Sequence, residues 1–148
     1  MEFDTVSPEA FGASLTGIGL NLLVRDVPAE VRFLKEVFGM EGHRVTDDYA
    51  ILTYHGAILQ LHADHTYSEN PLLGLLPETP PRGAGAEFRL YHTDPDEAAE
   101  LSEKAGGHVL QAPTNKPHGL RETYILCGNG YAWVASRPLT MDEQVALA

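Results

Sequence analysis

The sequence predicts an α+β fold in which two βαβββ repeats form a pseudo-symmetric, cupped mixed sheet. A short apolar run that ends in aspartate occurs twice, at residues 20–26 and again at residues 88–94. Each run is followed by an amphipathic helical pattern that ends at glycine. A second pair of apolar runs corresponds in the same way, at residues 56–61 and 130–135. Because internal duplication constrains a whole architecture, we expect two similar halves that share a concavity for a small molecule.

The first repeat is expected over residues 15–63. Residues 15–25 have the dense apolar pattern of a partly buried strand. Asp26 is a favourable helix N-cap. Apolar residues then recur every three or four positions, as in a helix that packs on a sheet: Val27, Val31, Leu34 and Phe38. Two stretches with strand patterns follow, roughly at residues 43–54 and 57–63, and a tight turn joins them.

A connector rich in proline and glycine is expected over residues 64–86, and the second repeat over residues 87–138. The helix of the second repeat has a strong start, because Asp94 is an N-cap and Pro95 occupies the first turn. Three strand patterns complete this repeat, at residues 108–111, 123–127 and 131–136. Residues 1–14 have no clear period and are expected to form an arm or a short turn.

The composition suits a single domain over residues 1–148, with 43% hydrophobic residues. There are 10 lysines and arginines against 21 aspartates and glutamates, which gives a formal charge of −11. This charge disfavours nucleic-acid and anionic-membrane partners and would favour a cationic ligand. The lone Cys127 cannot form an internal disulfide or a zinc cluster. Neither a signal-peptide pattern nor an apolar stretch of membrane-spanning length is found, so we expect a cytoplasmic protein.

Two segments resemble a known superfamily. Val24-Arg-Asp26 with Phe33 and residues 37–40, Val-Phe-Gly-Met, look like its opening strand and helix. Residues 116–122, Lys-Pro-His-Gly-Leu-Arg-Glu, are followed by Gly-Asn-Gly-Tyr at 128–131. With the duplicated βαβββ plan, these segments resemble the vicinal oxygen chelate superfamily, which includes glyoxalase I, bleomycin-resistance proteins and extradiol dioxygenases.

The second segment is similar to the Pro-Trp-Gly-x-Arg-Glu and Asp-Pro-Asp-Gly-Tyr elements of the bleomycin-resistance branch. His118 stands where that branch often has tryptophan, and Cys127-Gly128 replaces Asp-Pro. The resemblance covers roughly residues 15–138. It implies the glyoxalase/bleomycin-resistance fold, and it is only weakly specific for an activity because one scaffold hosts many chemistries.

For metal-using members, the resemblance implies four inward side chains, from the first, fourth, fifth and eighth strands. The internal repeat places these positions at Gly19, Gln60, Glu87 and Val134. Gly19 and Val134 have no ligand atom in their side chains, and a transition metal requires more than the remaining pair, usually with imidazole. We therefore expect no bound metal or other cofactor, with a divalent metal held through Gln60 and Glu87 as the disfavoured alternative.

Strand alternation predicts which side chains face the cavity. Together with two residues of the 116–122 segment, the expected ligand-binding residues are Asn21, Gln60, His62, Glu87, Arg89, Tyr91, His118 and Arg121. No catalytic residue is assigned. The other histidines lack metal-ligand spacing and are expected to be solvated or singly hydrogen-bonded. Trp133 and Leu59 have the opposite parity and are expected to pack under the helices.

Two charged pairs have alternative interpretations. Glu87 and Arg89 are either a ligand-facing pair or a structural salt bridge, because side chains two positions apart on a strand align. A glutamate buried in a partly apolar cup could have a raised pKa and act as a base, but nothing in the sequence shows that Glu87 does. Arg121 and Glu122 are either part of a loop at the cavity mouth or an exposed ion pair.

Three functional hypotheses follow. The first is a binding protein that sequesters a small cationic or aromatic molecule, and the bleomycin-resistance branch implies a homodimer. The second is a lyase, isomerase or dioxygenase of the superfamily that uses Gln60 and Glu87. Within it, the lactoylglutathione reaction is disfavoured, because its metal-bound carboxylate base would fall at Gln60 or Val134. The third is an interaction module whose cavity is plugged by apolar connector residues, namely Leu72, Leu73, Leu75 and Leu76.

Overall fold

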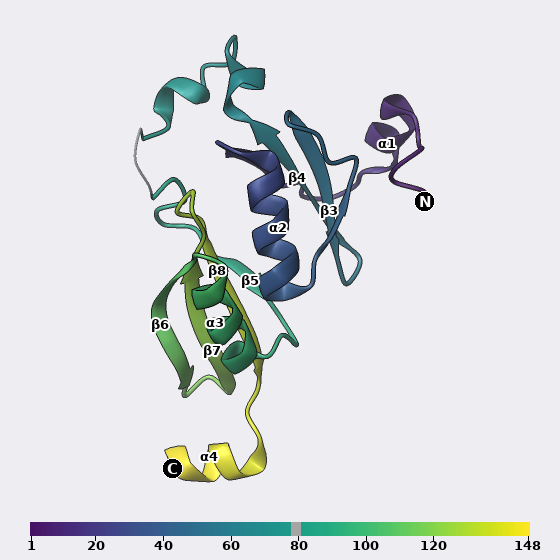
Figure 1. Ribbon diagram of the computed structural model, residues 1–148. Coiled ribbons are helices and arrows are strands. Elements are labelled where there is room, and N and C mark those ends of the chain that lie inside the picture. Colours follow the sequence, from purple (N-terminus) through teal and green to yellow (C-terminus); the bar gives the residue numbers. More distant parts are fainter. Residues whose placement is uncertain (78–80) are drawn as a thin grey trace. The chain divides into compact units, whose positions relative to one another are not determined.

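A computed structural model describes residues 1–77 and 81–148 of the chain. Residues 78–80 of the expected connector lie outside the described residues. The chain forms two compact units (Figure 1). Unit 1 comprises Met1–Lys35 and Gly39–Leu76, and unit 2 comprises Glu36–Phe38 and Pro77–Ala148. Each unit contains one four-stranded sheet.

Unit 1 contains the first βαβββ repeat, preceded by a short helix. Its helices are α1 (Pro8–Ser14) and α2 (Val27–Phe38), although the last turn of α2, Glu36–Phe38, belongs to unit 2. Its strands are β1 (Asn21–Val24), β2 (Glu41–His43), β3 (Tyr49–Tyr54) and β4 (Ala57–Ala63). Two 3₁₀ turns follow, η1 (Asp64–Tyr67) and η2 (Leu73–Leu75). The strand order is β1-β4-β3-β2, with β1 parallel to β4 and the other pairs antiparallel.

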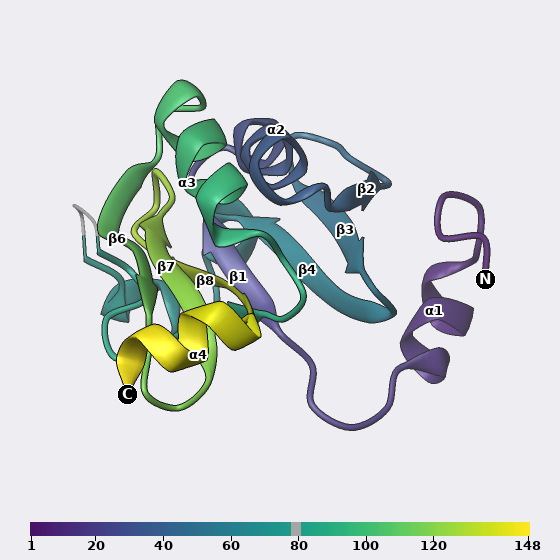
Figure 2. The ribbon, with the colours of Figure 1, turned by 90° about the horizontal axis from the view of Figure 1, so that it is seen from below.

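The second helix covers one face of this sheet (Figure 2). It begins where the Asp26 carboxylate accepts a hydrogen bond from the Ala29 backbone N–H at 3.0 Å, and it ends at Gly39, whose φ of 78° suits glycine. Val31 of α2 lies so close to Gly42 of β2 that a Cβ at position 42 would come within 2.8 Å of a Val31 methyl group. This close approach explains why glycine occupies position 42.

Unit 2 contains the second βαβββ repeat and a C-terminal helix. Its elements are β5 (Phe88–Leu90), α3 (Pro95–Lys104), β6 (His108–Asn115), β7 (Leu120–Leu126), β8 (Ala132–Pro138) and α4 (Met141–Leu147). The Asp94 carboxylate accepts hydrogen bonds from the backbone N–H groups of Asp96 and Glu97, as the sequence predicts. Trp133 is completely buried, and its ring lies 5.1 Å from that of Phe88.

The two sheets have equivalent topologies, which confirms the predicted fold class. The order in unit 2 is β5-β8-β7-β6, with β5 parallel to β8. Asn21 pairs with Gln60 between β1 and β4, and Arg89 pairs with Val134 between β5 and β8. The register of the repeat inferred from the sequence is therefore the register of the two sheets.

Several element boundaries differ from the sequence-based prediction. The expected strand at 43–54 is interrupted, because the Thr46 hydroxyl accepts hydrogen bonds from the backbone N–H groups of Asp48 and Tyr49 and closes a turn. The strand expected at 108–111 continues to Asn115. The N-terminal segment contains α1, which the Ser7 hydroxyl caps by accepting a hydrogen bond from the Ala10 N–H at 3.1 Å. Within the described residues, no helix combines the length and hydropathy needed to cross a bilayer.

Replacement of Gly42 by alanine should destabilise the protein by about 1–3 kcal/mol, because the β-branched Val31 cannot easily move away from the new methyl group. Urea unfolding measures the effect. Gly74→Ala is the matched control, since a Cβ there meets nothing within 4 Å. Equal stabilities of the two variants would show that the predicted clash is absent.

Candidate functional site

The predicted ligand-binding residues fall into two groups. Asn21, Gln60 and His62 lie in unit 1, and the other five lie in unit 2. Within unit 1, α1 and α2 lie on opposite sides of β3 and β4 (Figure 1). Strand alternation and pairing put Tyr49, Ile51 and Gln60 on one face of the sheet. This face is the one toward α1, because the three residues line a cavity together with residues of α1.

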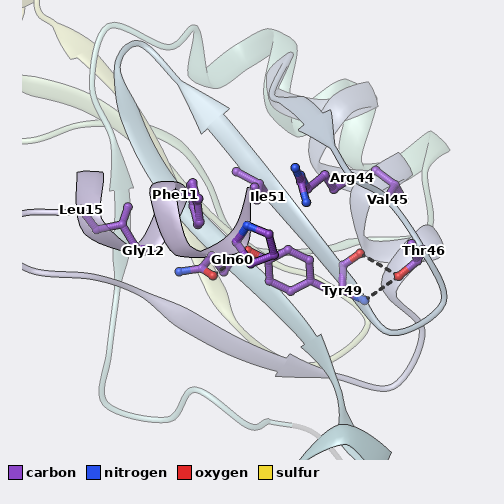
Figure 3. A pocket seen from close by; sticks show the side chains of 10 residues that line it. Phe11, Gly12, Leu15, Arg44, Val45, Thr46, Tyr49, Ile51 and Gln60 are labelled. Carbon is purple, nitrogen blue, oxygen red and sulfur yellow. Dashed lines mark hydrogen bonds between the residues drawn. The ribbon is translucent and has the colours of Figure 1, made fainter. Parts of the chain in front are cut away.

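A cavity of about 680 Å³ lies between α1 and this face of the sheet. Figure 3 shows the residues that line it, which come from α1, from the segment between β2 and β3, and from strands β3 and β4. The lining residues are Pro8, Phe11, Gly12, Leu15, Arg44, Val45, Thr46, Tyr49, Ile51 and Gln60. A second cavity of about 440 Å³ shares Leu15 and Gln60 with the first. Gln60 is thus the predicted site residue that the structure places at both cavities.

The polar part of the first cavity is formed by Tyr49 and Gln60. The Tyr49 hydroxyl donates a hydrogen bond to Gln60 Oε1 at 2.7 Å. Burial raises the pKa of Tyr49, with the charge of Arg44 acting in the opposite direction, so the phenol is protonated near neutral pH. Within residues 1–77 and 81–148, the Gln60 amide nitrogen has no hydrogen-bond partner. It therefore offers two N–H donors to a ligand.

Arg44 is the charged residue of the lining, and the N-terminal arm holds it in place. Its Nε donates to the Phe3 carbonyl oxygen at 2.6 Å, and its backbone N–H donates to Asp4 Oδ1 at 2.8 Å. Arg44 has a φ of 53°, which is unusual for a residue other than glycine. The Asp4 carboxylate also contacts His43 Nδ1 at 3.3 Å. The hydrogen bond from the Arg44 backbone, followed by that from His43, lowers the pKa of Asp4.

His62 and Asn21 lie near this region but do not line the first cavity. The His62 ring lies between two tyrosines, 5.2 Å from the Tyr49 ring and 5.3 Å from the Tyr67 ring. Burial lowers the pKa of His62, so the ring is neutral near pH 7. Among the described residues, nothing hydrogen-bonds to the buried His62 Nε2. Asn21 is exposed at the start of β1.

In unit 2, Glu87 and Arg89 belong to a larger hydrogen-bonded network. Arg89 forms ion pairs with Glu87, at 3.0 Å, and with Glu122, whose side chain is only 3% exposed. Tyr124 donates to Glu87 at 2.7 Å, and His118 Nε2 lies 3.3 Å from a Glu122 oxygen. Of the two alternatives for the Glu87–Arg89 pair, this geometry favours the structural one.

Glu87 does not have the raised pKa that burial in an apolar cup could produce. The hydrogen bond from Tyr124 and the contacts with Arg89 lower the Glu87 pKa more than desolvation raises it. Glu87 is therefore an ionised carboxylate whose two oxygens already accept hydrogen bonds. An arrangement of this kind makes the carboxylate a weaker base.

Both interpretations of Arg121 and Glu122 are wrong. The two residues lie on β7 rather than in a loop, and Glu122 is buried rather than exposed. Arg121 donates to both oxygens of Asp96, at 2.8 and 2.7 Å, and so connects β7 to the start of α3.

Tyr91 is 56% exposed, and the Arg89 guanidinium lies 5.9 Å from its ring centre.

The four positions that the resemblance implies for a metal offer few free ligand atoms. Gly19 and Val134 contribute no ligand atom, the Gln60 oxygen accepts from Tyr49, and both oxygens of Glu87 are engaged. Within the described residues, no three histidine, cysteine, aspartate or glutamate side chains are arranged to bind a metal. The connector leucines of the third hypothesis do not line the first cavity either.

Comparisons with known proteins support the fold. No family model and no curated protein matches the chain. A glyoxalase/bleomycin resistance protein/dioxygenase family enzyme from Burkholderia phytofirmans PsJN is similar with a TM-score of 0.67 and 20% identity, over 81% of this chain and 96% of the other. A glyoxalase-related enzyme from Fulvimarina pelagi has a TM-score of 0.68 and 20% identity, over 86% and 95% of the two chains.

A glyoxalase/bleomycin resistance protein/dioxygenase from Nocardioides is similar over 90% of this chain and 93% of its own, with a TM-score of 0.62 and 22% identity. At these identities the likeness establishes the fold. The chain has the glyoxalase/bleomycin-resistance fold that its sequence predicts.

Replacement of Tyr124 by phenylalanine should raise the Glu87 pKa toward its ordinary value of 4.5, because the largest contribution that lowers it is removed. A carboxylate whose pKa is lowered by folding stabilises the folded protein at pH values above its ordinary pKa. This stabilisation is lost as the pH falls through the pKa of the folded state. The stability difference between wild type and variant should therefore shrink in acid. NMR titration of the glutamate carboxyl carbons measures the pKa, with Tyr91→Phe as control. An unchanged Glu87 pKa in Tyr124→Phe would contradict this account.

Replacement of Glu122 by alanine should destabilise the protein by about 3 kcal/mol or more, because Arg89 loses its buried counter-ion. Glu100→Ala is the matched control, since Glu100 pairs with Lys104 at the surface and should contribute at most about 0.5 kcal/mol. Thermal and urea unfolding measure both variants. Similar losses would mean that burial does not distinguish the two ion pairs.

Proposed function

We propose that this protein binds a small molecule in the cavity around Gln60 and sequesters it without a bound metal. The observation that carries the proposal is the cavity itself. Its volume of about 680 Å³ lies within the 300–1,000 Å³ common for ligand sites. Its walls are mainly apolar, with a few converging polar groups from Arg44, Tyr49 and Gln60. That combination is typical of a ligand site, because apolar walls provide affinity and placed polar groups provide orientation.

The sign of the ligand charge needs separate consideration. The net charge of −11 predicts a cationic ligand. Of the described residues that line the cavity, however, none is acidic and Arg44 is cationic. The proposal therefore includes no preference for cations at this cavity.

The proposal has further parts. The resemblance to the bleomycin-resistance branch supports a homodimer, and the net charge of −11 disfavours nucleic-acid and anionic-membrane partners. We also propose a cytoplasmic location. Light scattering of the purified protein tests the oligomeric state. The alternative enzyme that uses Gln60 and Glu87 has less support, because hydrogen bonds occupy both Glu87 oxygens and lower the Glu87 pKa.

The neutral apolar dye N-phenyl-1-naphthylamine provides a direct test, since its fluorescence rises in an apolar site. Wild-type protein should bind the dye, and Gly12→Phe should bind it at least about tenfold more weakly, because Gly12 lines the cavity and a new ring would fill it. Ala10→Phe is the matched control, because it adds the same ring to α1 outside the lining.

Two results would overturn the proposal. One is the absence of dye binding by the wild type, and the other is equal binding by Gly12→Phe and Ala10→Phe. Elemental analysis of protein purified without chelators tests the metal-free part separately. A stoichiometric metal, together with loss of dye binding after chelation, would contradict it.

A further inference from the structure

We propose that the ligand of this cavity is an amphiphilic anion, with an apolar body and a carboxylate that Arg44 binds. The inference rests on the proposed function, because it names the chemical class of ligand for the same cavity. It is carried by three features of the lining: the charge of Arg44, the hydrogen-bonding state of its guanidinium, and the donors that surround the cavity.

Arg44 is held in place without a direct ion pair among the described residues, although the Asp4 carboxylate attracts its charge from nearby. Its guanidinium uses Nε to bind the neutral Phe3 carbonyl, and in the described parts of the chain no carboxylate pairs with it. Asp4, the acid that contacts Arg44, accepts from the backbone N–H and from His43 instead. Nη1 and Nη2 are therefore available for a planar, bidentate interaction with a carboxylate.

Three other arginines of this protein form ion pairs with carboxylates. Arg89 pairs with Glu87 and Glu122, Arg121 with Asp96, and Arg137 with Glu143. Each of the three is partly buried, as Arg44 is. Removing a guanidinium from water without a counter-ion is unfavourable, so a bound anion would supply at Arg44 what the glutamates and aspartates supply elsewhere.

The remaining polar groups of the lining favour an acceptor-rich ligand. Gln60 offers the N–H groups of its amide, since its oxygen is occupied by Tyr49. The Thr46 hydroxyl is already engaged, since it accepts from two backbone N–H groups and donates to the Tyr49 carbonyl oxygen, so the free donors are those of Arg44 and Gln60. A carboxylate, or a carboxylate with a further carbonyl or hydroxyl oxygen, matches these donors. Phe11, Leu15 and Ile51 would contact the apolar body of the ligand.

The N-terminal arm takes part in this site in two ways. Three of its residues line the cavity, namely Pro8, Phe11 and Gly12, and the adjoining Leu15 does too. Phe3 and Asp4 orient Arg44, and the Phe3 ring packs 6.1 Å from Phe11 and 5.2 Å from His43. The arm is therefore a wall of the site and a support for the residue that binds the anion.

Matched probes test the inference. The two carboxylates are 4-phenylbutyrate, which has an aromatic body, and decanoate, which has an aliphatic one. Each is compared with the neutral amide and the cationic amine that have the same body, which gives six probes. Isothermal calorimetry at pH 7 and constant ionic strength should give the carboxylates at least about tenfold higher affinity than the amides, with the amines weakest. Arg44→Gln should reduce carboxylate affinity to the level that the same variant has for the amide, and thermal unfolding checks that the variant remains folded.

Arg32→Gln is the control, because it removes the same charge from an exposed position on α2. Arg44→Lys, which keeps the charge and loses the planar fork, should give an intermediate loss. Equal binding of carboxylate and amide, or the same loss in Arg32→Gln, overturns the inference. The inference is also overturned if none of the six probes binds while the neutral dye does. In each of these cases the proposed function, binding of a small molecule in the cavity, still stands. Absence of dye binding overturns the proposed function itself.

Discussion

The parallel pairing of the first and last strands in each repeat is the constraint on which the rest of the structure depends. In unit 1 it places Asn21 beside Gln60, and in unit 2 it places Arg89 beside Val134. A parallel pair requires a crossover between its strands, and the helix of each repeat lies within that crossover. In unit 1 that helix covers one face of the sheet, so the side chains of the other face are available for α1, for a cavity and for polar contacts.

The two repeats use equivalent positions for different chemistry. In unit 1 the position of Gln60 carries an amide whose N–H groups face a cavity, and in unit 2 its equivalent is the fully buried Val134. The charges of unit 2 satisfy one another, since Glu87 and Glu122 pair with Arg89. Unpaired donors bind ligands better than paired ions do, because paired ions must first be separated. This difference is why we assign binding to the first repeat.

The net charge of this protein is negative, whereas the charged residue that lines the cavity is positive. A net charge of −11 describes the long-range field, whereas a ligand in the cavity experiences the guanidinium of Arg44 at close range. The same distinction applies to Glu87. The apolar character of a cup predicts a raised pKa, but two specific hydrogen bonds reverse the direction. In both cases a few near neighbours outweigh the average environment.

The sequence by itself determined the duplicated βαβββ plan, the caps at Asp26 and Asp94, and the face on which Gln60 lies. These features depend on residues close together in the chain, where capping and strand alternation apply directly. Only the tertiary structure decided that Glu122 is buried against Arg89, 33 residues away, and that Phe3 holds Arg44 from 41 residues away. The physical reason is that such contacts depend on strand register and on where a segment without periodicity packs, and local propensities specify neither.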